Sequence, residues 1–268
     1  MSKLSKLLQS RDDYWAEDFL PLHNIIFDKT ALAASAASMG WPVPKNLSII
    51  ESLRDIPYSS LPSRFVVKPN NNWSCNGVLL IRDGCELLTG DHFSNVVDYV
   101  TQRMGVGYIN GGENLPPPKS YVIEEMVEDY NPLVLIPRDF KVYSVRGKNK
   151  LVQVIDRNVK LNGAYAASAY WVDGWRRTII GNGETYEGID LVPEPPPQAL
   201  LHSLYDLTSS VSSNIGAAVR VDCYLTSNGA LLGEITSSPG GGNTVNYEFS
   251  RSFLRWISKD QVCTHWRT

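Results

Sequence analysis

Two acidic side chains lie on the neighbouring arms of a sequence pattern that is typical of a β-hairpin. The stretch "RVDCYLTSNGALLGEITSSPGG" begins at Arg220 and joins two alternating segments through Ser-Asn-Gly. Residues two apart in a strand share a face, so we expect Arg220 and Asp222 on one polar face of the first arm. The second arm is expected to carry three residues on one face: Leu232, Glu234 and Thr236. Each arm therefore presents a carboxylate.

The length of the connecting loop decides whether the two carboxylates meet. A three-residue loop, 227–229, whose final glycine is left-handed would place Asp222 opposite Glu234 and Arg220 opposite Thr236. A two-residue Asn-Gly turn would shift this pairing by one residue. The first alternative predicts that the two carboxylates face each other.

Facing carboxylates need a positive partner. At a separation of about 4 Å their repulsion is about 4 kcal/mol at an effective dielectric near 20, and like charges directly opposite each other destabilise a sheet. Mg²⁺ suits such a pair, because one or two carboxylates hold it while water and substrate phosphates complete its shell. The hairpin would then belong to a nucleotide enzyme. The alternative is a solvated hairpin whose acids point into water.

The overall composition is that of an ordinary globular protein. The chain has 268 residues, of which 43% are hydrophobic and 20% charged, and its formal net charge is −3. This balance lacks the basic excess of a nucleic-acid scaffold, so no nucleic-acid partner is expected. No apolar run approaches the roughly 20 residues of a membrane span, and the N-terminus lacks the apolar core of a signal peptide. The four cysteines form no CxxC pair, which favours reduced thiols and a cytoplasmic location.

Local patterns predict the elements that position the hairpin. Helices are expected over four ranges: 29–40, 92–104, 194–216 and 246–259. Strands are expected over these ranges: 64–68, 77–82, 121–127, the two arms of 138–157 around a Gly-Lys-Asn turn, and the two arms of 220–236. The segment 160–188 has no clear period and receives no assignment. Hairpins clustered around a few helices predict an α+β fold with mainly antiparallel sheets.

A lysine and a polar loop could bind phosphate. Lys68 ends the strand "RFVVK" and is followed by Pro and the loop "NNNWSCNG", residues 70–77. Backbone amides of such a loop can wrap phosphate oxygens, with the lysine as a point charge. The chain has no GxxxxGK[ST] motif, so a Walker-type site is not expected. The alternative is an ordinary hairpin connection.

Acidic residues at the end of the strand "YVIEEMV" could mark an adenine site. Glu124 and Glu125 follow an apolar run, and an adenine could stack on Met126 while bonding to exposed backbone. A sheet edge with solvated acids is the alternative.

The segment "RDFKVYSV" offers further polar contacts to a nucleotide. Asp139 and Lys141 share a face, so Asp139 could bind a ribose hydroxyl and Lys141 a phosphate. A surface ion pair between them is equally compatible with the sequence. Arg157, at the end of the next strand, taken alone is ordinary surface charge.

The order of these motifs resembles the ATP-grasp superfamily, in particular its TupA-like branch, which is associated with teichuronopeptide synthesis. The motifs are "DK", "GWPVP", "FVVKP" with its polar glycine loop, "VIEEMV", "RDFKVYSVRGK", "VIDR", "RVDCY" and "GEITSSPGG". They extend from Asp28 to about Gly242. Single motifs are degenerate, but the six from "FVVKP" to "GEITSSPGG" in this order are specific.

The resemblance implies a set of nucleotide contacts. Lys68 would bind ATP phosphate, and the loop 70–77 would be the mobile lid over the phosphates. Asp139 would be the ribose ligand or its neighbour, and Lys141 and Arg157 would be further phosphate cations. The lid contacts would come from Ser74, Asn76 and Gly77, and the adenine contacts from Glu124, Glu125, Met126 and Val127.

The resemblance also implies the metal ligands and an oxyanion contact. Asp222 and Glu234 match the metal carboxylates, and Thr236 stands where the family has an asparagine, so a second Mg²⁺ would be held more loosely. Arg220 matches the arginine that stabilises the oxyanion of acyl transfer, assisted by backbone amides of the turn 238–241.

The resemblance divides the chain into a helical extension, 1–28, and an ATP-grasp domain, 29–268. That domain would consist of a lid-type lobe over about 60–120 and a catalytic lobe over about 121–268, with ATP between them. Many ATP-grasp ligases have an N-terminal domain that helps to bind the carboxylate substrate, and the first 27 residues are too few to form it. The aromatic segment 164–175 is a candidate to hold the acceptor instead.

The implied activity is ATP- and Mg²⁺-dependent ligation of a small-molecule carboxylate to an amine through an acyl phosphate. The product would be an amide between an amino acid and a uronic acid of a surface polysaccharide, or a peptide bond in a small natural product. A kinase of the same fold, acting on a hydroxyl, and a non-catalytic nucleotide-binding module are the alternatives.

Overall fold

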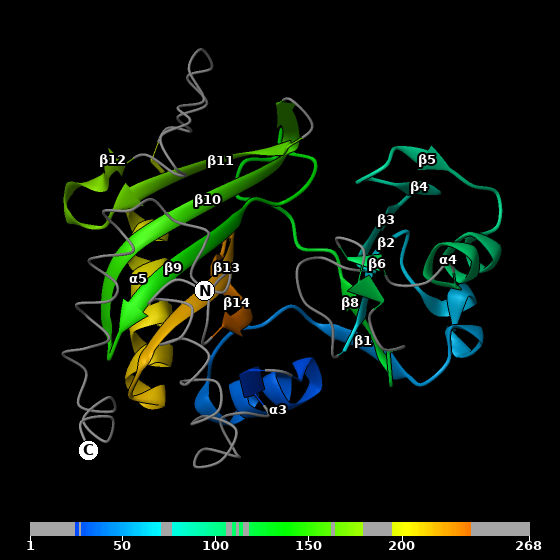
Figure 1. Ribbon diagram of the computed structural model, residues 1–268, viewed down its shortest axis with the longest axis horizontal. Coiled ribbons are helices and arrows are strands. Elements are labelled where there is room, and N and C mark those ends of the chain that lie inside the picture. The colour runs from blue at the N-terminus through cyan, green and yellow to red at the C-terminus, as the bar shows by residue number, and fades with distance from the viewer. Residues whose placement is uncertain are drawn as a thin grey trace.

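Two antiparallel sheets lie side by side in the computed structural model (Figure 1). The structure describes residues 25–26, 28–70, 77–105, 109–110, 113–114, 118–161, 164–178 and 195–236. Within these ranges each of the two larger sheets has six strands, and β6 (Ile109–Asn110) and β7 (Glu113–Asn114) form a separate pair. The predicted α+β class with mainly antiparallel sheets is confirmed.

The first sheet has the strand order β1-β8-β2-β3-β4-β5. Its strands are β1 (Asn46–Ile50), β2 (Arg64–Pro69), β3 (Leu79–Arg82), β4 (Cys85–Glu86), β5 (Asp91–His92) and β8 (Tyr121–Glu125). Helix α4 (Val96–Gly105) and the 3₁₀ turns η1 (Leu53–Asp55) and η2 (Tyr58–Ser60) accompany it. Phe65, Val67 and Ile123 form its core with Val100 of α4. Strand β8 begins at residue 121, the predicted start of the catalytic lobe, and it pairs with β1 and β2 of this first sheet.

Helix α4 is shorter than the predicted helix 92–104. The chain at Asp91–His92 pairs with β4 as strand β5, and the Asn95 side chain accepts hydrogen bonds from the backbone of Val97 and Asp98. An asparagine that accepts such bonds begins a helix, because the first backbone N–H groups have no partner within it. The helix therefore starts at Val96.

The second sheet has the strand order β12-β11-β10-β9-β13-β14. Its elements are β9 (Asp139–Val145), β10 (Lys148–Leu161), β11 (Ala164–Trp171), η3 (Asp173–Trp175), β12 (Arg176–Thr178), β13 (Ala218–Thr226) and β14 (Gly229–Thr236). Strands β11 and β12 arise in the segment that sequence patterns left unassigned. The turn between β9 and β10 is Arg146–Gly147, with φ of +46° and +78°, and not the predicted Gly-Lys-Asn.

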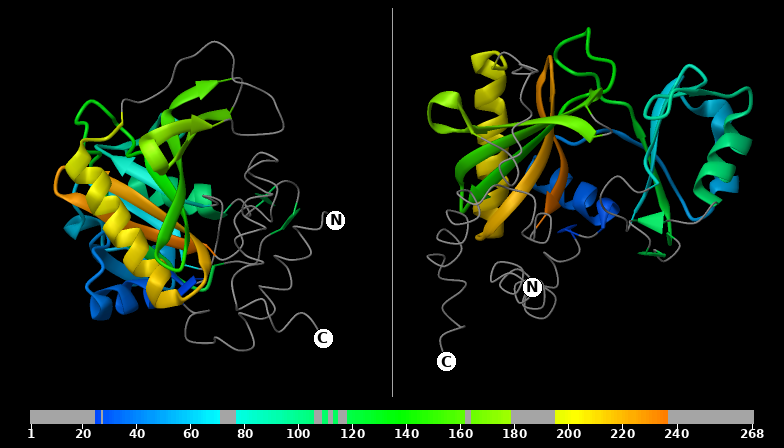
Figure 2. Two further views of the ribbon diagram at one scale, coloured as in Figure 1. Left: turned by 90° about the vertical axis from the view of Figure 1, so that its left-hand side faces the viewer. Right: turned by 45° about the horizontal axis from the view of Figure 1, so that its top comes forward.

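Helix α5 (Gln198–Ile215) covers one face of the second sheet, as Figure 2 shows. Leu204 and Val211 of α5 pack in one core with Val142, Val221 and Leu225 of the sheet. The predicted helix end is confirmed, because Gly216 has φ +74° and its backbone N–H closes the last turn. Residues that alternate with the core residues along β9 and β13 point away from α5, and these include the polar side chains of the predicted site.

Helix α3 (Lys29–Met39) lies below and between the two sheets in Figure 1. Asp28 accepts hydrogen bonds from the backbone of Thr30 and Ala31, which begins the helix, and Gly40 with φ +69° ends it. Leu32 and Ala36 pack in the core of the second sheet. The helix predicted over 29–40 is confirmed.

The hairpin of β13 and β14 has the predicted pairing of Asp222 with Glu234, for a different reason than expected. The loop has two residues, Ser227 and Asn228, since Thr226 pairs with Gly229. This turn alone would shift the register by one. A β-bulge lies further from the turn: Cys223 pairs with Leu232, but Asp222, the residue before Cys223, pairs with Glu234 and skips Gly233. The extra residue is Gly233, and it restores the register.

The bulge also changes which residues of β14 share a face. Leu232, expected beside Glu234, is 1% exposed and packs in the core with Ile235. One extra residue reverses the alternation of a strand, so the bulge turns Glu234 to the face of β14 opposite Leu232. Bulges re-aim side chains next to active sites, and Gly233 has this effect on Glu234.

We expect Gly233→Ala to destabilise the hairpin. A Cβ at position 233 would lie 3.0 Å from Cε2 of Tyr224 and 3.3 Å from the carbonyl oxygen of Asp222. Overpacking of this kind costs about 1–3 kcal/mol, measurable as a lower urea midpoint. Adding Tyr224→Leu removes the closer contact, so the double variant should recover part of the loss. A Gly233→Ala protein with unchanged stability would show that the bulge has room for a side chain.

Candidate active site

Polar side chains from four adjacent strands gather on the face of the second sheet that points away from α5. The strand pairings place Glu234, Asp222, Lys141 and Gln153 in one row across β14, β13, β9 and β10. A neighbouring row contains Thr236, Arg220 and Tyr143. The structure therefore brings together the predicted metal, oxyanion and phosphate residues of this sheet.

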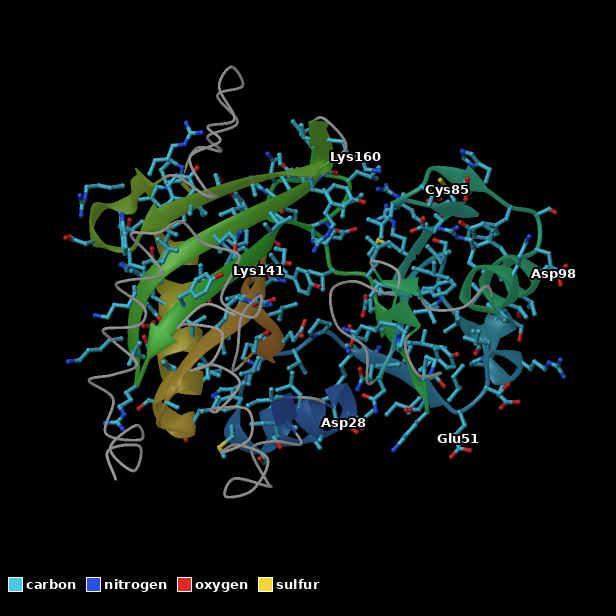
Figure 3. The ribbon with its side chains drawn as sticks, viewed as in Figure 1. Asp28, Glu51, Cys85, Asp98, Lys141 and Lys160 are labelled. Carbon is cyan, nitrogen blue, oxygen red and sulfur yellow. The ribbon has the colours of Figure 1, made fainter. Side chains whose placement is uncertain are left out.

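Asp222 is the centre of a buried ion-pair network. Arg220 donates from Nε to Oδ1 of Asp222 at 2.6 Å and from Nη2 to Oδ2 at 2.8 Å. Lys141, labelled on β9 in Figure 3, donates from Nζ to Oδ2 of Asp222 at 2.5 Å. Asp222 is only 5% exposed, so it would be costly to ionise without these partners.

The network continues to the other end of β9. Nζ of Lys141 lies 2.7 Å from Oδ2 of Asp139, and Nη2 of Arg157 lies 3.2 Å from the same oxygen. Asp139, predicted as the ribose ligand or its neighbour, thus pairs with both predicted phosphate cations and is buried. Positive and negative side chains alternate along this chain of ion pairs, which leads from Arg157 through Asp139, Lys141 and Asp222 to Arg220.

The two facing carboxylates have opposite pKa shifts. Burial acts to raise the pKa of Asp222, but the charges of Arg220 and Lys141 outweigh it and hold that pKa below its ordinary value. Burial raises the pKa of Glu234, and the Asp222 charge raises it further. Of these two carboxylates, Glu234 is therefore the one whose charge is less compensated, and an additional cation beside it would be stabilising.

We expect Glu234→Gln to raise stability near neutral pH while it lowers activity. Because the folded-state pKa of Glu234 lies above its ordinary value of 4.5, its ionisation costs stability as pH rises through the folded pKa. The melting temperature of Glu234→Gln should exceed that of the unaltered protein at pH 7 to 8, and the difference should disappear towards pH 4.5. Turnover should fall by at least about 100-fold, the effect of losing one electrostatic contact to the transition state.

The exposed Glu51 at the end of β1 provides the matched control for this charge change. Glu51→Gln should alter neither turnover nor the pH dependence of melting. A Glu234→Gln protein that melts lower at pH 7 than the unaltered protein would show that Glu234 is a stabilising ion-pair partner instead.

A second buried ion pair lies on the first sheet. Nζ of Lys68 is 2.5 Å from Oε2 of Glu124, and both residues are 8% exposed. β2 and β8 bring them together, since Lys68 pairs with Val122 and Val66 with Glu124. The predicted phosphate lysine and a predicted adenine residue are thus in direct contact.

The rest of the predicted adenine segment follows Glu124. Glu125 is exposed, and its backbone N–H donates to the carbonyl oxygen of Lys45 at 2.9 Å. Met126 is buried at 7% exposure, and Val127 is half-buried. The connection to β9 is held by the buried Asp129, which accepts from Nη2 of Arg138 at 2.6 Å.

Lys29 at the start of α3 is absent from the residues predicted from the sequence. Burial lowers its pKa, and this is opposed mainly by the charge of Glu234 on the second sheet. Lys68 and Glu124 of the first sheet also act on it. Lys29 therefore lies within electrostatic range of both sheets. The signal in the sequence was the Asp-Lys pair at the start of an alanine-rich helix, where Asp28 caps the helix.

Several predicted positions lie outside the described residues. They are Ser74 and Asn76 of the predicted lid, the turn 238–241, the predicted helix 246–259 and most of the extension 1–28. Gly77 is described and has φ +71°, the left-handed conformation expected where the loop ends.

The donor set on β13 and β14 fits a magnesium ion. Among the described residues no group of three or more His, Cys, Asp and Glu side chains is placed to hold a metal. Asp222 and Glu234 supply two carboxylates, and the hydroxyl of Thr236, which accepts from Nη2 of Arg220 at 3.0 Å, supplies a neutral oxygen. Two carboxylates are the usual protein share of a Mg²⁺ shell that substrate phosphates complete.

The family described as TupA-like ATPgrasp matches residues 33–260. No curated protein sequence matches the chain.

Solved structures of similar fold include three enzymes. D-alanine–D-alanine ligase from Bacillus anthracis complexed with ATP has a TM-score of 0.54 and 15% identity, over 90% of this chain and 67% of that one. The D-alanine–D-alanine ligase from Helicobacter pylori has a TM-score of 0.51 and 14% identity, over 89% of this chain and 62% of that one. D-cycloserine synthetase DcsG has a TM-score of 0.51 and 13% identity, over 89% of this chain and 71% of that one.

The described helices include none that is both long and apolar enough to span a bilayer.

Proposed function

The chain belongs to the TupA-like ATP-grasp family, and from this premise we propose that it is an ATP-dependent carboxylate–amine ligase. The observation that carries the proposal is the buried charge cluster on the second sheet, in which Asp222 lies opposite Glu234 on one side and opposite Lys141 on the other and is also bound by Arg220. A site of this kind stabilises charge without offering a nucleophile. Phosphoryl transfer needs positioning and electrostatic stabilisation more than a nucleophilic side chain.

In the proposed first step, the γ-phosphoryl group of ATP passes to a substrate carboxylate, which gives an acyl phosphate and ADP. Lys68 on the first sheet, Lys29 at the start of α3, and Lys141 and Arg157 on the second sheet would bind the phosphates and neutralise their charge. Asp222, Glu234 and Thr236 would hold Mg²⁺, which when bound supplies charge neutralisation at the transferred phosphoryl group. Asp139 would keep Lys141 and Arg157 in position.

In the proposed second step, an amine attacks the acyl carbon and phosphate leaves, which forms the amide. Arg220 would stabilise the oxyanion that develops on the acyl oxygen, because its guanidinium is buried and already oriented by Asp222 and Thr236. The adenine would lie at the segment Glu124–Val127, near the end of β8.

For the substrates we propose an amino acid and a uronic acid of a surface polysaccharide, the pair that the TupA-like branch implies. A small natural product joined through a peptide bond is the alternative. Strand β11 and η3, which form the predicted acceptor segment 164–175, extend the second sheet beside β10, so they could hold this substrate. Because the reaction consumes ATP and the described cysteines Cys85 and Cys223 are free thiols, we place the enzyme in the cytoplasm.

An ADP-release screen tests the proposal. Uronic acids and amino acids are crossed in pairs with ATP and Mg²⁺, and ADP is measured together with amide product by mass spectrometry. A ligase requires both a carboxylate and an amine for amide formation. Release of ADP with a phosphorylated hydroxyl from a single acceptor would identify a kinase, and nucleotide binding without turnover over the whole panel would identify a non-catalytic module.

A further inference from the structure

Asn70 joins two segments of the site that are 41 residues apart in the chain. It follows β2 directly, two residues after Lys68, and is 7% exposed. Its side-chain Oδ1 accepts from the backbone N–H of Lys29 at 2.8 Å and from that of Thr30 at 3.3 Å. Its backbone carbonyl accepts from Nζ of Lys29 at 3.1 Å.

The remaining polar groups of Asn70 are also in use. Its backbone N–H donates to the carbonyl oxygen of Ser120 at 3.0 Å, and a hydrogen bond from its side chain helps to lower the pKa of Asp28, although burial opposes this shift. Asn70 is thus fixed by β8 on one side and by the start of α3 on the other. A buried amide with this many bonds has a single orientation.

The side chain of Asn70 fixes the first turn of α3 relative to the end of β2. The first N–H groups of a helix have no partner within the helix. Asp28 accepts from Thr30 and Ala31, and Asn70 supplies a further acceptor, from another part of the chain, for Lys29 and Thr30. Because Asn70 also bonds to the ammonium of Lys29, it fixes both ends of that side chain.

Lys68 and the residue that binds Lys29 therefore lie in one short segment, 68–70, at the end of β2. Lys68 is oriented by Glu124 and Lys29 by Asn70, and Lys29 is within electrostatic range of Lys68 and of Glu234. Two ammonium groups that repel each other stay close only where other contacts fix them. We propose that Asn70 is a positioning residue that holds Lys29 beside Lys68 at the nucleotide phosphates. This inference rests on the proposed function, since it takes the two lysines as phosphate contacts.

A double-mutant cycle tests whether Asn70 acts through Lys29. Binding of the non-hydrolysable analogue β,γ-imido-ATP with Mg²⁺ is measured by calorimetry for the unaltered protein, Asn70→Ala, Lys29→Met and the double variant. Asn70→Ala keeps the backbone carbonyl that accepts from Nζ of Lys29 and removes the Oδ1 that accepts from the backbone of Lys29 and Thr30. We expect it to weaken binding about fivefold, the effect of one lost neutral hydrogen bond at the start of α3. Lys29→Met should weaken it at least as much, and the double variant should bind no more weakly than Lys29→Met alone.

A purely structural role gives a different result. In that case the effect of Asn70→Ala on analogue binding would be the same in the Lys29→Met background as in the unaltered protein, and the inference would be overturned. Asn149 provides the matched control, because its side chain likewise bonds to the backbone and side chains of another element, the carbonyl of Tyr205 and the hydroxyls of Ser209 and Thr208 on α5. Asn149→Ala should lower the melting temperature and leave analogue binding unchanged.

The remaining outcomes are also decisive. Asn70→Ser, whose shorter side chain cannot reach both N–H groups, replaces Asn70→Ala in the cycle if the alanine variant does not fold. If Lys29→Met binds the analogue normally while Asn70→Ala weakens binding, Asn70 does not act through Lys29. That result would overturn the inference and leave the ligase proposal standing. Failure of the unaltered protein to bind the analogue at all would overturn the nucleotide site, and the inference with it.

Discussion

Asp222→Asn is expected to lose Mg²⁺-dependent turnover by at least about 100-fold, the effect of removing one preorganised electrostatic contact. It should also lower stability, because Asp222 is the shared partner of Arg220 and Lys141. Breaking a buried ion pair from one side leaves an uncompensated charge and costs about 3–5 kcal/mol. Turnover is measured as ADP release at a temperature where circular dichroism shows that the variant is folded, and stability as the urea midpoint.

The combination of effects distinguishes Asp222 from its partner across the hairpin. Glu234→Gln and Asp222→Asn should both lose activity, but only the second should lose stability, since the two carboxylates have opposite pKa shifts. Asp206→Asn, an exposed aspartate on α5, serves as the control and should change neither quantity. Turnover by Asp222→Asn within a few-fold of the unaltered protein would remove Asp222 from the metal site.

Arg220→Met is expected to slow amide formation by about 10²- to 10³-fold, the cost of one lost oxyanion contact. Only acyl transfer develops an oxyanion after the phosphoryl group has moved, so ADP release should suffer less. The ratio of amide to ADP should therefore fall, with hydroxylamine as a small amine that gives a hydroxamate. This ratio is the informative measurement, because loss of stability alone lowers both products together.

Arg220 is also an ion-pair partner of Asp222, and the experiment must separate this structural role from the proposed oxyanion contact. Arg220 makes two bonds to Asp222 and one to Thr236, so Arg220→Met also removes a counter-charge from Asp222, the proposed metal ligand. Arg220→Lys retains the charge without the paired geometry and should recover ADP release better than amide formation. Arg103→Met, at an exposed position of α4, controls for the chemistry of the change. An unchanged amide-to-ADP ratio in Arg220→Met would identify Arg220 as an ion-pair partner alone.

Much of the fold could be predicted from the sequence because its signals are local. The helix α3 is encoded by Asp28, an alanine-rich run and Gly40, all within one short segment. The alternation of Arg220 and Asp222 with core residues along β13 is likewise a property of a strand with period two. The family resemblance added roles to these residues, and those of Asp222, Glu234, Arg220 and Lys68 remain proposals that the variants above test.

The hairpin register shows where local reasoning reached its limit. The pairing of Asp222 with Glu234 was correct, but the loop that was expected to produce it is a two-residue turn, and the bulge at Gly233 compensates. A bulge depends on what lies across the strand, here the ring of Tyr224, whose Cε2 would be 3.0 Å from a Cβ at position 233. No pattern within β14 reports that contact.

The sequence by itself predicted helices α3 and α5 and the strands that carry the site, because backbone periodicity and helix-end residues act over a few positions. It did not predict strands β11 and β12 or the bulge that turns Glu234 away from the face of Leu232. Only the tertiary structure decided that Asp139 pairs with both Lys141 and Arg157, that Glu124 pairs with Lys68, and that Asn70 bonds to Lys29. These partners are separated by up to 56 residues in sequence, the distance from Lys68 to Glu124. Electrostatic and hydrogen-bond energies depend on separation in space and on burial, and both are set by how the two sheets and α3 pack together.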